Sequence, residues 1–304
     1  MTDVSIIIPC YNQGEFLADS VGSALAQTYE AVEVIVVDDG SDDEKTRTAM
    51  AELPPEVTLL RTENRGLPAA RNHGIEAAGG EFICCLDADD MLHEDYIKET
   101  AALLQNDTAG EYAIVTTGVR NFGEEDRPGR TESFDPIRLL LENCMHVASL
   151  FRRSSWEEVG GYDEALAGYQ DWEFWISIVE RGYKWARIDK ELFFYRKRTG
   201  SMVSGSDAMR DRLIAQIVGK HRDFYTRNLT GLVVRADEIC AKLRDDLREE
   251  RAAGRAKVAR LARVLAQPVS SWRDVVLAPF RIAKVFVPDR AKDAIKTKLK
   301  RRER

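Results

Sequence analysis

The sequence predicts an α/β fold: a mostly parallel sheet flanked by helices, with a helical extension toward the C-terminus. Apolar runs typical of buried strands alternate with segments of helical spacing through the first 117 residues. Polar residues directly follow three of these runs, and open α/β sheets bind ligands at such strand ends. From about residue 207 the pattern is helical and charged, with few strand signals. This order predicts helices on both faces of the sheet.

The elements follow one another as repeated strand and helix units. Strands are expected at residues 4–8, 32–37, 57–60 and 81–86, and helices at residues 17–25, 67–78 and 171–181. Because the carboxyl ends of parallel strands share one edge of a sheet, the residues after three of these strands should meet there. They are residues 9–12, 38–40 and 87–89.

The fourth strand ends in three carboxylates within four residues. Strand alternation would place Asp87 and Asp89 on the same face at the end of a buried strand. Two hard oxygen ligands suit Mg²⁺ or Mn²⁺, which keep waters and take further ligands from a substrate diphosphate. Asp90 should point away and cap a helix that begins near residue 93 or 94. The alternative is a solvated turn that only ends the strand.

Length and composition indicate one large domain, or a domain with an accessory region. The 304 residues are 44% hydrophobic and 31% charged, and no apolar stretch approaches the ~20 residues that span a bilayer. The first residues lack the features of a signal peptide, so we expect a cytoplasmic protein. Five cysteines without a Cys-x-x-Cys pair indicate neither a disulfide framework nor a zinc site. Dinucleotide and Walker phosphate-loop motifs are absent.

Charge is distributed unevenly along the chain. Residues 251–304 carry 16 Lys and Arg against 4 Asp and Glu, whereas the whole chain has a net charge of −7. From residue 268 onward basic residues alternate with Trp272, Phe280 and Phe286. Such a segment fits peripheral contact with an anionic membrane surface. A helical extension packed on the main domain or on a dimer partner is the alternative. The acidic body argues against nucleic acid.

Six motifs in register resemble the family 2 glycosyltransferases, enzymes of the Rossmann-like GT-A fold that transfer sugars from nucleotide donors with inversion. The motifs lie at residues 4–12 (VSIIIPCYN), 36–41 (VVDDGS), 64–67 with 70–74 (NRGL and ARNHG), 86–90 (LDADD), 160–164 (GGYDE) and 170–172 (QDW). The resemblance covers about residues 1–205. A helical extension is expected at 206–267 and a basic amphipathic tail at 268–304.

The resemblance implies a hexosyl- or N-acetylhexosaminyltransferase. Its donor would be a nucleotide sugar, with UDP-sugars favoured. Its acceptor would be a hydroxyl of a growing surface glycan or of a lipid-linked oligosaccharide. The donor sugar, the linkage and the oligomeric state are not fixed by any motif.

The resemblance also implies which residues hold the donor. Pro9, Tyr11 and Asp39 would line the nucleoside pocket, where Tyr11 offers an aromatic face and Asp39 accepts hydrogen bonds from base and ribose. Arg71 would lie near the base or the diphosphate, where its guanidinium can donate several hydrogen bonds. The alternatives are a tyrosine packed on the sheet edge, a turn aspartate and a surface arginine.

At the Asp-Ala-Asp tip, the resemblance implies that Asp89 ligates the metal directly and that Asp87 contacts the ribose or metal-bound water. A cation there neutralises the charge that develops on the leaving diphosphate. Many relatives have a histidine where this chain has Arg198, which cannot ligate a metal. We expect Arg198 to contact the diphosphate after loop closure. A solvated basic turn is the alternative.

Inverting transfer requires a base on the acceptor side, and Asp171 is the candidate. The family usually has Glu-Asp at this point, whereas this chain has Gln170-Asp171, a change that bears on the acceptor contacts. Asp171 could also cap the following helix. His73 and His146 are expected to be structural.

Two other classes of protein were weighed. A catalytically silent nucleotide- or carbohydrate-binding protein could keep the same fold, but the intact Asp39, Asp87, Asp89 and Asp171 argue against it. A nucleotidyltransferase would need a glycine-rich basic phosphate loop near the N-terminus, which this chain lacks.

Overall fold

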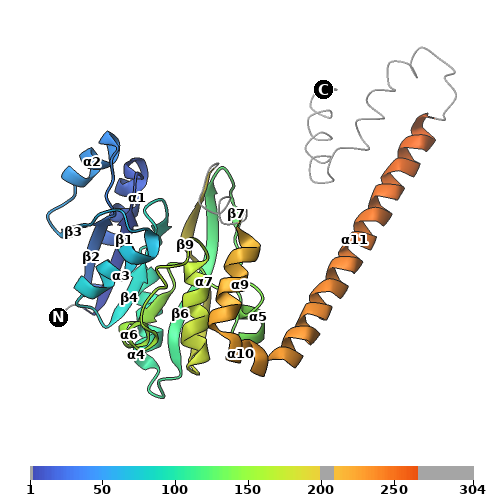
Figure 1. Ribbon diagram of the computed structural model, residues 1–304. Coiled ribbons are helices and arrows are strands. Elements are labelled where there is room, and N and C mark those ends of the chain that lie inside the picture. Colours follow the sequence, from blue (N-terminus) through green and yellow to red (C-terminus); the bar gives the residue numbers. More distant parts are fainter. Residues whose placement is uncertain (1–2, 199–208, 266–304) are drawn as a thin grey trace, which may run out of the picture. The chain divides into compact units, whose positions relative to one another are not determined.

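A computed structural model of the chain describes residues 3–198 and 209–265 (Figure 1). The chain divides into two units, Met1–Val233 and Val234–Arg304. The first unit contains the sheet and its helices. The described part of the second unit is the continuation of one long helix, α11 (Leu229–Leu265). The predicted boundary at residue 205 stays a prediction, and the tail predicted at 268–304 lies outside the described residues.

One mixed sheet organises the first unit. Its strands are β1 (Val4–Cys10), β2 (Val32–Asp38), β3 (Val57–Arg61), β4 (Phe82–Cys85), β5 (Met91–Leu92), β6 (Tyr112–Gly123), β7 (Arg127–Pro128), β8 (Leu150–Arg152) and β9 (Lys184–Lys197). They lie in the order β3-β2-β1-β4-β8-β6-β9-β5, and β7 pairs with β6. The predicted α/β fold is confirmed.

The two halves of the sheet differ in strand direction. The ladders β1 with β2, β1 with β4 and β2 with β3 are parallel, as helical crossovers between successive strands require. Beyond β4, strand β8 runs antiparallel to both β4 and β6, whereas β6 and β9 are parallel. The parallel order that the sequence predicts therefore holds throughout the N-terminal half and gives way to mixed pairing in the second half.

Helices cover both faces of the sheet. They are α1 (Gly14–Leu25), α2 (Glu44–Ala51), α3 (Leu67–Ala77), α4 (Tyr96–Asn106), α5 (Pro136–Leu139), α6 (Arg153–Val159), α7 (Gln170–Glu180), α9 (Arg210–Lys220) and α10 (Arg222–Arg227), followed by α11. Ile6 and Ile8 of β1 pack in one core cluster with α1 and α4, and Ile7 packs in the other with α3 and α7. A central strand buried on both faces follows from this alternation.

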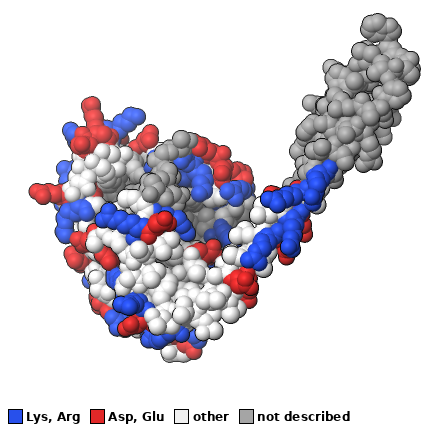
Figure 2. All heavy atoms as spheres, turned by 45° about the vertical axis from the view of Figure 1, so that its right-hand side comes forward, with Lys and Arg blue, Asp and Glu red and all other residues white. Residues whose placement is uncertain are grey.

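Helix α11 is polar along most of its described length. Figure 2 shows Lys and Arg side chains gathered along it, and Arg244, Arg248 and Arg251 are among the exposed ones. Within residues 3–198 and 209–265, no helix is both long enough and apolar enough to cross a membrane.

Candidate active site

A cavity of about 760 Å³ opens at the carboxyl ends of β1, β2 and β4. Every site residue that the sequence predicts lines it: Pro9, Tyr11, Asp39, Arg71, Asp87, Asp89, Asp171 and Arg198. Parallel pairing of β1 with its two neighbours brings the three polar strand ends together, as predicted. The contacts of each residue, described next, bear on its role in the cavity.

Asp39 holds the loop that leads into α3. Its carboxylate accepts hydrogen bonds from the backbone N–H groups of Arg65 and Gly66, both at 2.9 Å, and from the Thr62 hydroxyl at 3.1 Å. Asp39 is 3% exposed, whereas Tyr11 is 43% exposed at the cavity. The contacts explain how Asp39 is held in place, and its predicted contact with the nucleoside stays a prediction.

Arg71 is a buried cation on α3. Its Nη2 donates to Asp87 Oδ1 at 2.7 Å, and its guanidinium lies 5.5 Å from the centre of the Tyr162 ring. Only 2% of its side chain is exposed, so the alternative of a surface arginine is wrong. A buried charge requires a partner, which Asp87 supplies at the cavity wall. Gly74 lets α3 approach β1, since a Cβ there would lie 2.4 Å from a methyl group of Ile7.

The Asp-Ala-Asp tip is a turn and not a continuation of the strand. Strand β4 ends before it, and the N–H of Asp90 bonds to the carbonyl of Asp87 at 3.0 Å. The strand alternation that we expected at Asp87 and Asp89 is therefore wrong, although both residues line the cavity. The predicted cap role of Asp90 is also wrong, because Asp95 precedes α4 and Asp90 turns inward to accept the N–H of Arg196 at 2.8 Å.

Asp89 forms an ion pair with Arg198. The Nε of Arg198 donates to Asp89 Oδ2 at 2.9 Å, and 16% of the Asp89 side chain is exposed. Burial raises the pKa of Asp89, the charge of Asp87 raises it further, and Arg198 opposes both. Each of the two carboxylates thus carries one guanidinium, Arg71 on Asp87 and Arg198 on Asp89.

These donors fit a divalent cation that takes its remaining ligands from elsewhere. Asp87 and Asp89 offer hard carboxylate oxygens, each with one oxygen outside its arginine contact. Within the described residues, no group of three His, Cys, Asp or Glu side chains could hold a metal ion. Mg²⁺ and Mn²⁺ sites built on one or two carboxylates are completed by water and substrate phosphate, so the residues present suit these ions.

Asp171 lies in the first turn of α7, facing the cavity. The residue at the cap position is Tyr169, and Asp171 lies inside the helix, so the alternative that Asp171 caps α7 is wrong. Instead Asp171 Oδ2 accepts from Asn143 Nδ2 at 2.8 Å. Burial raises the pKa of Asp171, against the opposing effects of Arg71, a backbone N–H and Asn143. A carboxylate with a raised pKa is a better proton acceptor.

Helix α7 is fixed by a buried polar cluster that the sequence did not reveal. Glu173 is fully buried, and its Oε1 contacts the side chains of Ser177, Lys220 and His221 at 2.8 to 2.9 Å. His221 also contacts Glu180 at 2.7 Å. These bonds fasten α9 and the start of α10 to the helix that carries Asp171.

The second wall of the cavity was also missed. It consists of side chains from β6, β7, β9 and the segment before β8, namely Val119, Asn121, Arg127, His146, Phe193, Tyr195 and Lys197. His146 stacks on Phe193 at 4.3 Å between ring centres, and burial lowers its pKa to about 3, so it is neutral. His73 lies on α3 and pairs with Glu76 at 4.0 Å.

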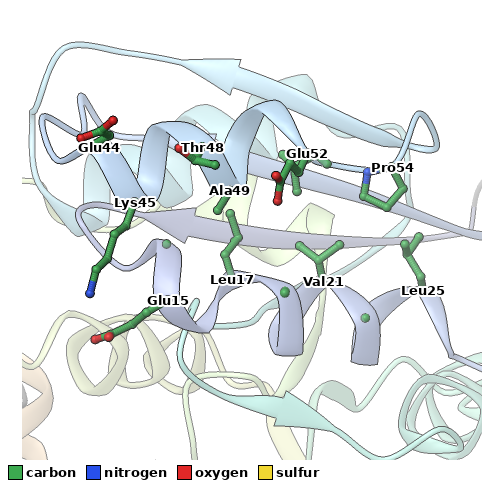
Figure 3. A pocket seen from close by; sticks show the side chains of 14 residues that line it. Glu15, Leu17, Val21, Leu25, Glu44, Lys45, Thr48, Ala49, Glu52 and Pro54 are labelled. Carbon is green, nitrogen blue, oxygen red and sulfur yellow. The ribbon is translucent and has the colours of Figure 1, made fainter.

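A second hollow lies between α1 and α2 (Figure 3). Its volume of about 790 Å³ is similar, but Leu17, Val21, Ala49 and other apolar side chains form its floor. Its charged residues, such as Glu15 and Lys45, stand at the edge in Figure 3. Because binding sites combine apolar walls with convergent polar groups, the cavity at the strand ends is the candidate active site.

The mixed sheet with flanking helices is the GT-A type of fold that the sequence motifs imply, and comparison with known proteins agrees. The family profile of glycosyl transferase family 2 matches residues 5–160. The structure of S. aureus TarS residues 1–349 in complex with UDP-GlcNAc superposes with a TM-score of 0.58 at 19% identity, covering 75% of each chain. At that identity the likeness concerns the fold. The chain belongs to glycosyl transferase family 2.

Curated relatives support the same family. An uncharacterized glycosyltransferase of Rickettsia felis is 32% identical over 188 residues, which cover 58% of this chain and 31% of the relative. Glycosyltransferase GlyG of Streptococcus pneumoniae is 36% identical over 126 residues, 40% of this chain and 41% of GlyG. Chondroitin synthase of Escherichia coli is 29% identical over 188 residues, 59% of this chain and 27% of the synthase. The chain thus spans less than half the length of these three relatives.

Proposed function

We propose that this glycosyltransferase moves a hexose or N-acetylhexosamine from a UDP-sugar, with inversion, to a hydroxyl of a surface glycan or a lipid-linked acceptor. One observation carries the proposal: the carboxylates of Asp89 and Asp171 open onto the same cavity as the strand ends that carry Tyr11 and Asp39. A metal-binding carboxylate and a second, separate carboxylate are the two groups that an inverting transfer needs. The UDP-GlcNAc complex of TarS supports the choice of donor.

On the donor side, Pro9, Tyr11 and Asp39 would bind the nucleoside, with Tyr11 as the exposed aromatic face. Arg71 holds Asp87 in place through its 2.7 Å hydrogen bond. Asp89 and Asp87 would hold a divalent cation, Mn²⁺ or Mg²⁺, whose charge stabilises the leaving nucleoside diphosphate. Arg198 would exchange its bond to Asp89 for one to the diphosphate, since a guanidinium binds phosphate oxygens as readily as it binds carboxylate oxygens.

On the acceptor side, Asp171 would accept the proton of the attacking hydroxyl. Its raised pKa suits this role, because a base works best when its pKa lies closer to the operating pH. Asn143 orients the carboxylate through the 2.8 Å bond to Oδ2, which leaves Oδ1 for the acceptor hydroxyl. The neighbouring Gln170 donates to the carbonyl of Leu166 at 3.3 Å and also lines the cavity.

The test is nucleoside diphosphate release from UDP-, GDP- and dTDP-sugars, with and without Mn²⁺, for wild type, Asp89→Asn and the surface control Glu56→Gln. We expect slow release from UDP-sugars alone. Release should need the metal and fall by a factor of about 10² or more in Asp89→Asn, as for other charge-stabilising groups.

Glu56→Gln should match the wild type. Nucleotide binding without release from any donor would contradict the proposal and support a silent binding protein instead. The ion pair of Arg198 with Asp89, which occupies part of the proposed metal site, is the observation that favours that second candidate.

A further inference from the structure

The second wall of the cavity is a sheet face with an apolar end and a cationic end. Asn121 of β6 pairs with Arg127 of β7 and with Tyr195 of β9. Residues paired across neighbouring strands point to the same face, as do residues two apart along a strand. Lys197 therefore continues the row of Tyr195, and all four residues line the cavity. The opposite end of the face is apolar, with Val119 and Phe193.

This cationic end lies in the half of the cavity that contains the proposed base, which we call the acceptor half. The half around Tyr11 and Asp39 is called the donor half. In the sheet order, the strands β1 and β2 that carry Tyr11 and Asp39 lie on one side of β4, and β6 and β9 lie on the other. Asp171, the proposed base, comes from α7, which follows β8 in the chain and packs against Phe151 of β8 through Phe174 and Trp175. The Asp-Ala-Asp turn after β4 thus separates the nucleoside end from the wall of Asn121, Arg127 and Lys197.

Among the described residues, Lys197 has no carboxylate partner. Arg71 and Arg198 are bound to Asp87 and Asp89, and Arg127 is bound to Glu125 of its own hairpin at 2.8 Å. The Lys197 ammonium instead lies 4.4 Å from the centre of the Tyr195 ring, and it forms no ion pair with any residue in the described ranges. Its backbone is fixed, because its carbonyl accepts the N–H of Glu124 at 3.0 Å.

Asn121 lies on the same face. The residue is 5% exposed and lines the cavity, and its side-chain amide makes no hydrogen bond with the part of the chain that the structure describes. Its amide atoms are not among the fully buried unpartnered ones, so they reach the cavity and are available to a ligand there. An amide, a tyrosine hydroxyl, an ammonium and a guanidinium on one face together can bind a sugar that carries an anionic group.

We propose that the acceptor is an anionic glycan, with a carboxylate or phosphate group bound by Lys197 and Arg127, and with Asn121 and Tyr195 contacting its sugar hydroxyls. This inference rests on the proposed function and specifies its acceptor. The acceptor hydroxyl is thereby held between the charged wall and Asp171. The exposed glutamate partner of Arg127 can be displaced at little cost, because a surface ion pair contributes only about 0–1 kcal/mol.

The experiment measures binding of four oligosaccharide probes to the enzyme with UDP and Mn²⁺, by calorimetry. The probes are a glucuronate-terminated oligosaccharide, its neutral methyl ester, a glycerol phosphate oligomer and a glucose-terminated oligosaccharide. Wild type should bind one of the anionic probes at least about 10-fold more tightly than the two neutral ones, as charge-assisted hydrogen bonds predict. Preference for glucuronate or for glycerol phosphate distinguishes a carboxylate from a phosphate acceptor.

Variants at Lys197 test whether this wall is responsible. Lys197→Met should weaken binding of the preferred anionic probe about 10- to 100-fold and abolish the preference over the methyl ester, whereas Lys197→Arg should retain it. The matched control is Lys184→Met at the other end of β9, where Lys184 pairs with Glu111 at 3.0 Å outside the cavity. It should bind like the wild type.

Equal binding of charged and neutral probes by the wild type overturns the inference, as does binding of none of them. A larger effect of Lys197→Met on UDP affinity than on the probes also overturns it, because Lys197 would then belong to the diphosphate site. UDP-sugar cleavage without acceptor tests the proposed function separately, so the two can fail independently.

Discussion

The donor half and the acceptor half of the cavity are built in different ways. In the donor half, around β1, β2 and β4, each polar residue follows its strand directly, and parallel pairing brings the strand ends together. In the acceptor half, the wall is a sheet face whose neighbouring strands β6 and β9 are separated along the chain by β7, β8 and three helices, α5, α6 and α7. Local sequence motifs can therefore encode the first half and not the second.

The largest effect should come from the proposed base, Asp171. Asp171→Asn keeps the shape of the side chain and its contact with Asn143 but removes the proposed proton acceptor. We expect the turnover number for sugar transfer to fall by a factor of about 10² to 10⁴. Transfer is measured with a radiolabelled donor.

Asp126→Asn serves as the control, since Asp126 pairs with Arg120 at the surface. A change of less than tenfold in Asp171→Asn, with normal folding, would show that another group is the base.

In the donor half, the buried cation of α3 should dominate stability. Arg71→Met leaves the Asp87 carboxylate without its 2.7 Å partner. Breaking a buried ion pair costs about 3 kcal/mol or more of the free energy of unfolding. Urea denaturation measures the loss.

Arg65→Met is the matched control, because 65% of the Arg65 side chain is exposed and its ion pair with Glu164 should contribute less than about 1 kcal/mol. Equal losses in the two variants would contradict the structural role of Arg71.

Alanine substitutions at two helical glycines should change the stability of the donor half in opposite directions. Gly74→Ala places a methyl group 2.4 Å from Ile7 and 2.9 Å from Val37, and we expect a loss of about 1–3 kcal/mol. Gly22→Ala on α1 has no atom within 4 Å of its new Cβ and should stabilise by about 0.5–1 kcal/mol. Thermal unfolding of both variants checks the signs. Stabilisation by Gly74→Ala would show that α3 packs less closely on β1 than described.

The smallest effect is a pH dependence in the acceptor half. Burial lowers the pKa of His221, but Glu173 and Glu180 outweigh burial and raise it. Burial raises the pKa of Glu173, but His221 and Lys220 outweigh it and lower that pKa. The stabilisation from His221 is thus complete below its ordinary pKa of about 6.5 and is lost as pH rises through the raised value.

The contribution of Glu173 is complete above its ordinary pKa of about 4.3 and is lost as pH falls through the lowered value. The melting temperature should therefore decrease as the pH rises from the ordinary pKa of His221, about 6.5, through its raised value, and the decrease should be smaller in His221→Gln. The same slope in both proteins would contradict this account of the cluster.

The sequence predicted most of the donor half, because the residues of that half lie in short motifs that directly follow strands. Asp39 and Asp87 each follow an apolar run that can only be a buried strand, and the motif order indicated which strand ends meet. What it missed depends on distant pairing. The contact of Arg198 with Asp89 joins residues 109 positions apart. Asn121 and Lys197 come onto one face only through the register of β6 and β9, and no short pattern encodes that register.

Strand alternation also misled us at the Asp-Ala-Asp tip. We assumed that the strand continued through the carboxylates, whereas β4 ends before them and a turn takes over. A turn allows Asp90 to face the interior while Asp87 and Asp89 line the cavity. Asp87 and Asp89 therefore line the cavity as predicted, but because of a turn and not because of strand alternation.

The division of labour between Asp89 and Asp171 is the central claim, and Mn²⁺-dependent UDP binding tests it most directly. Calorimetry gives the dissociation constant of UDP for the wild type, for Asp89→Asn and for Asp171→Asn, each measured with and without the metal. We predict that Asp171→Asn binds UDP like the wild type and that Asp89→Asn loses the metal dependence. Equal loss of metal-dependent binding in both variants would contradict the assignment of separate donor and acceptor carboxylates.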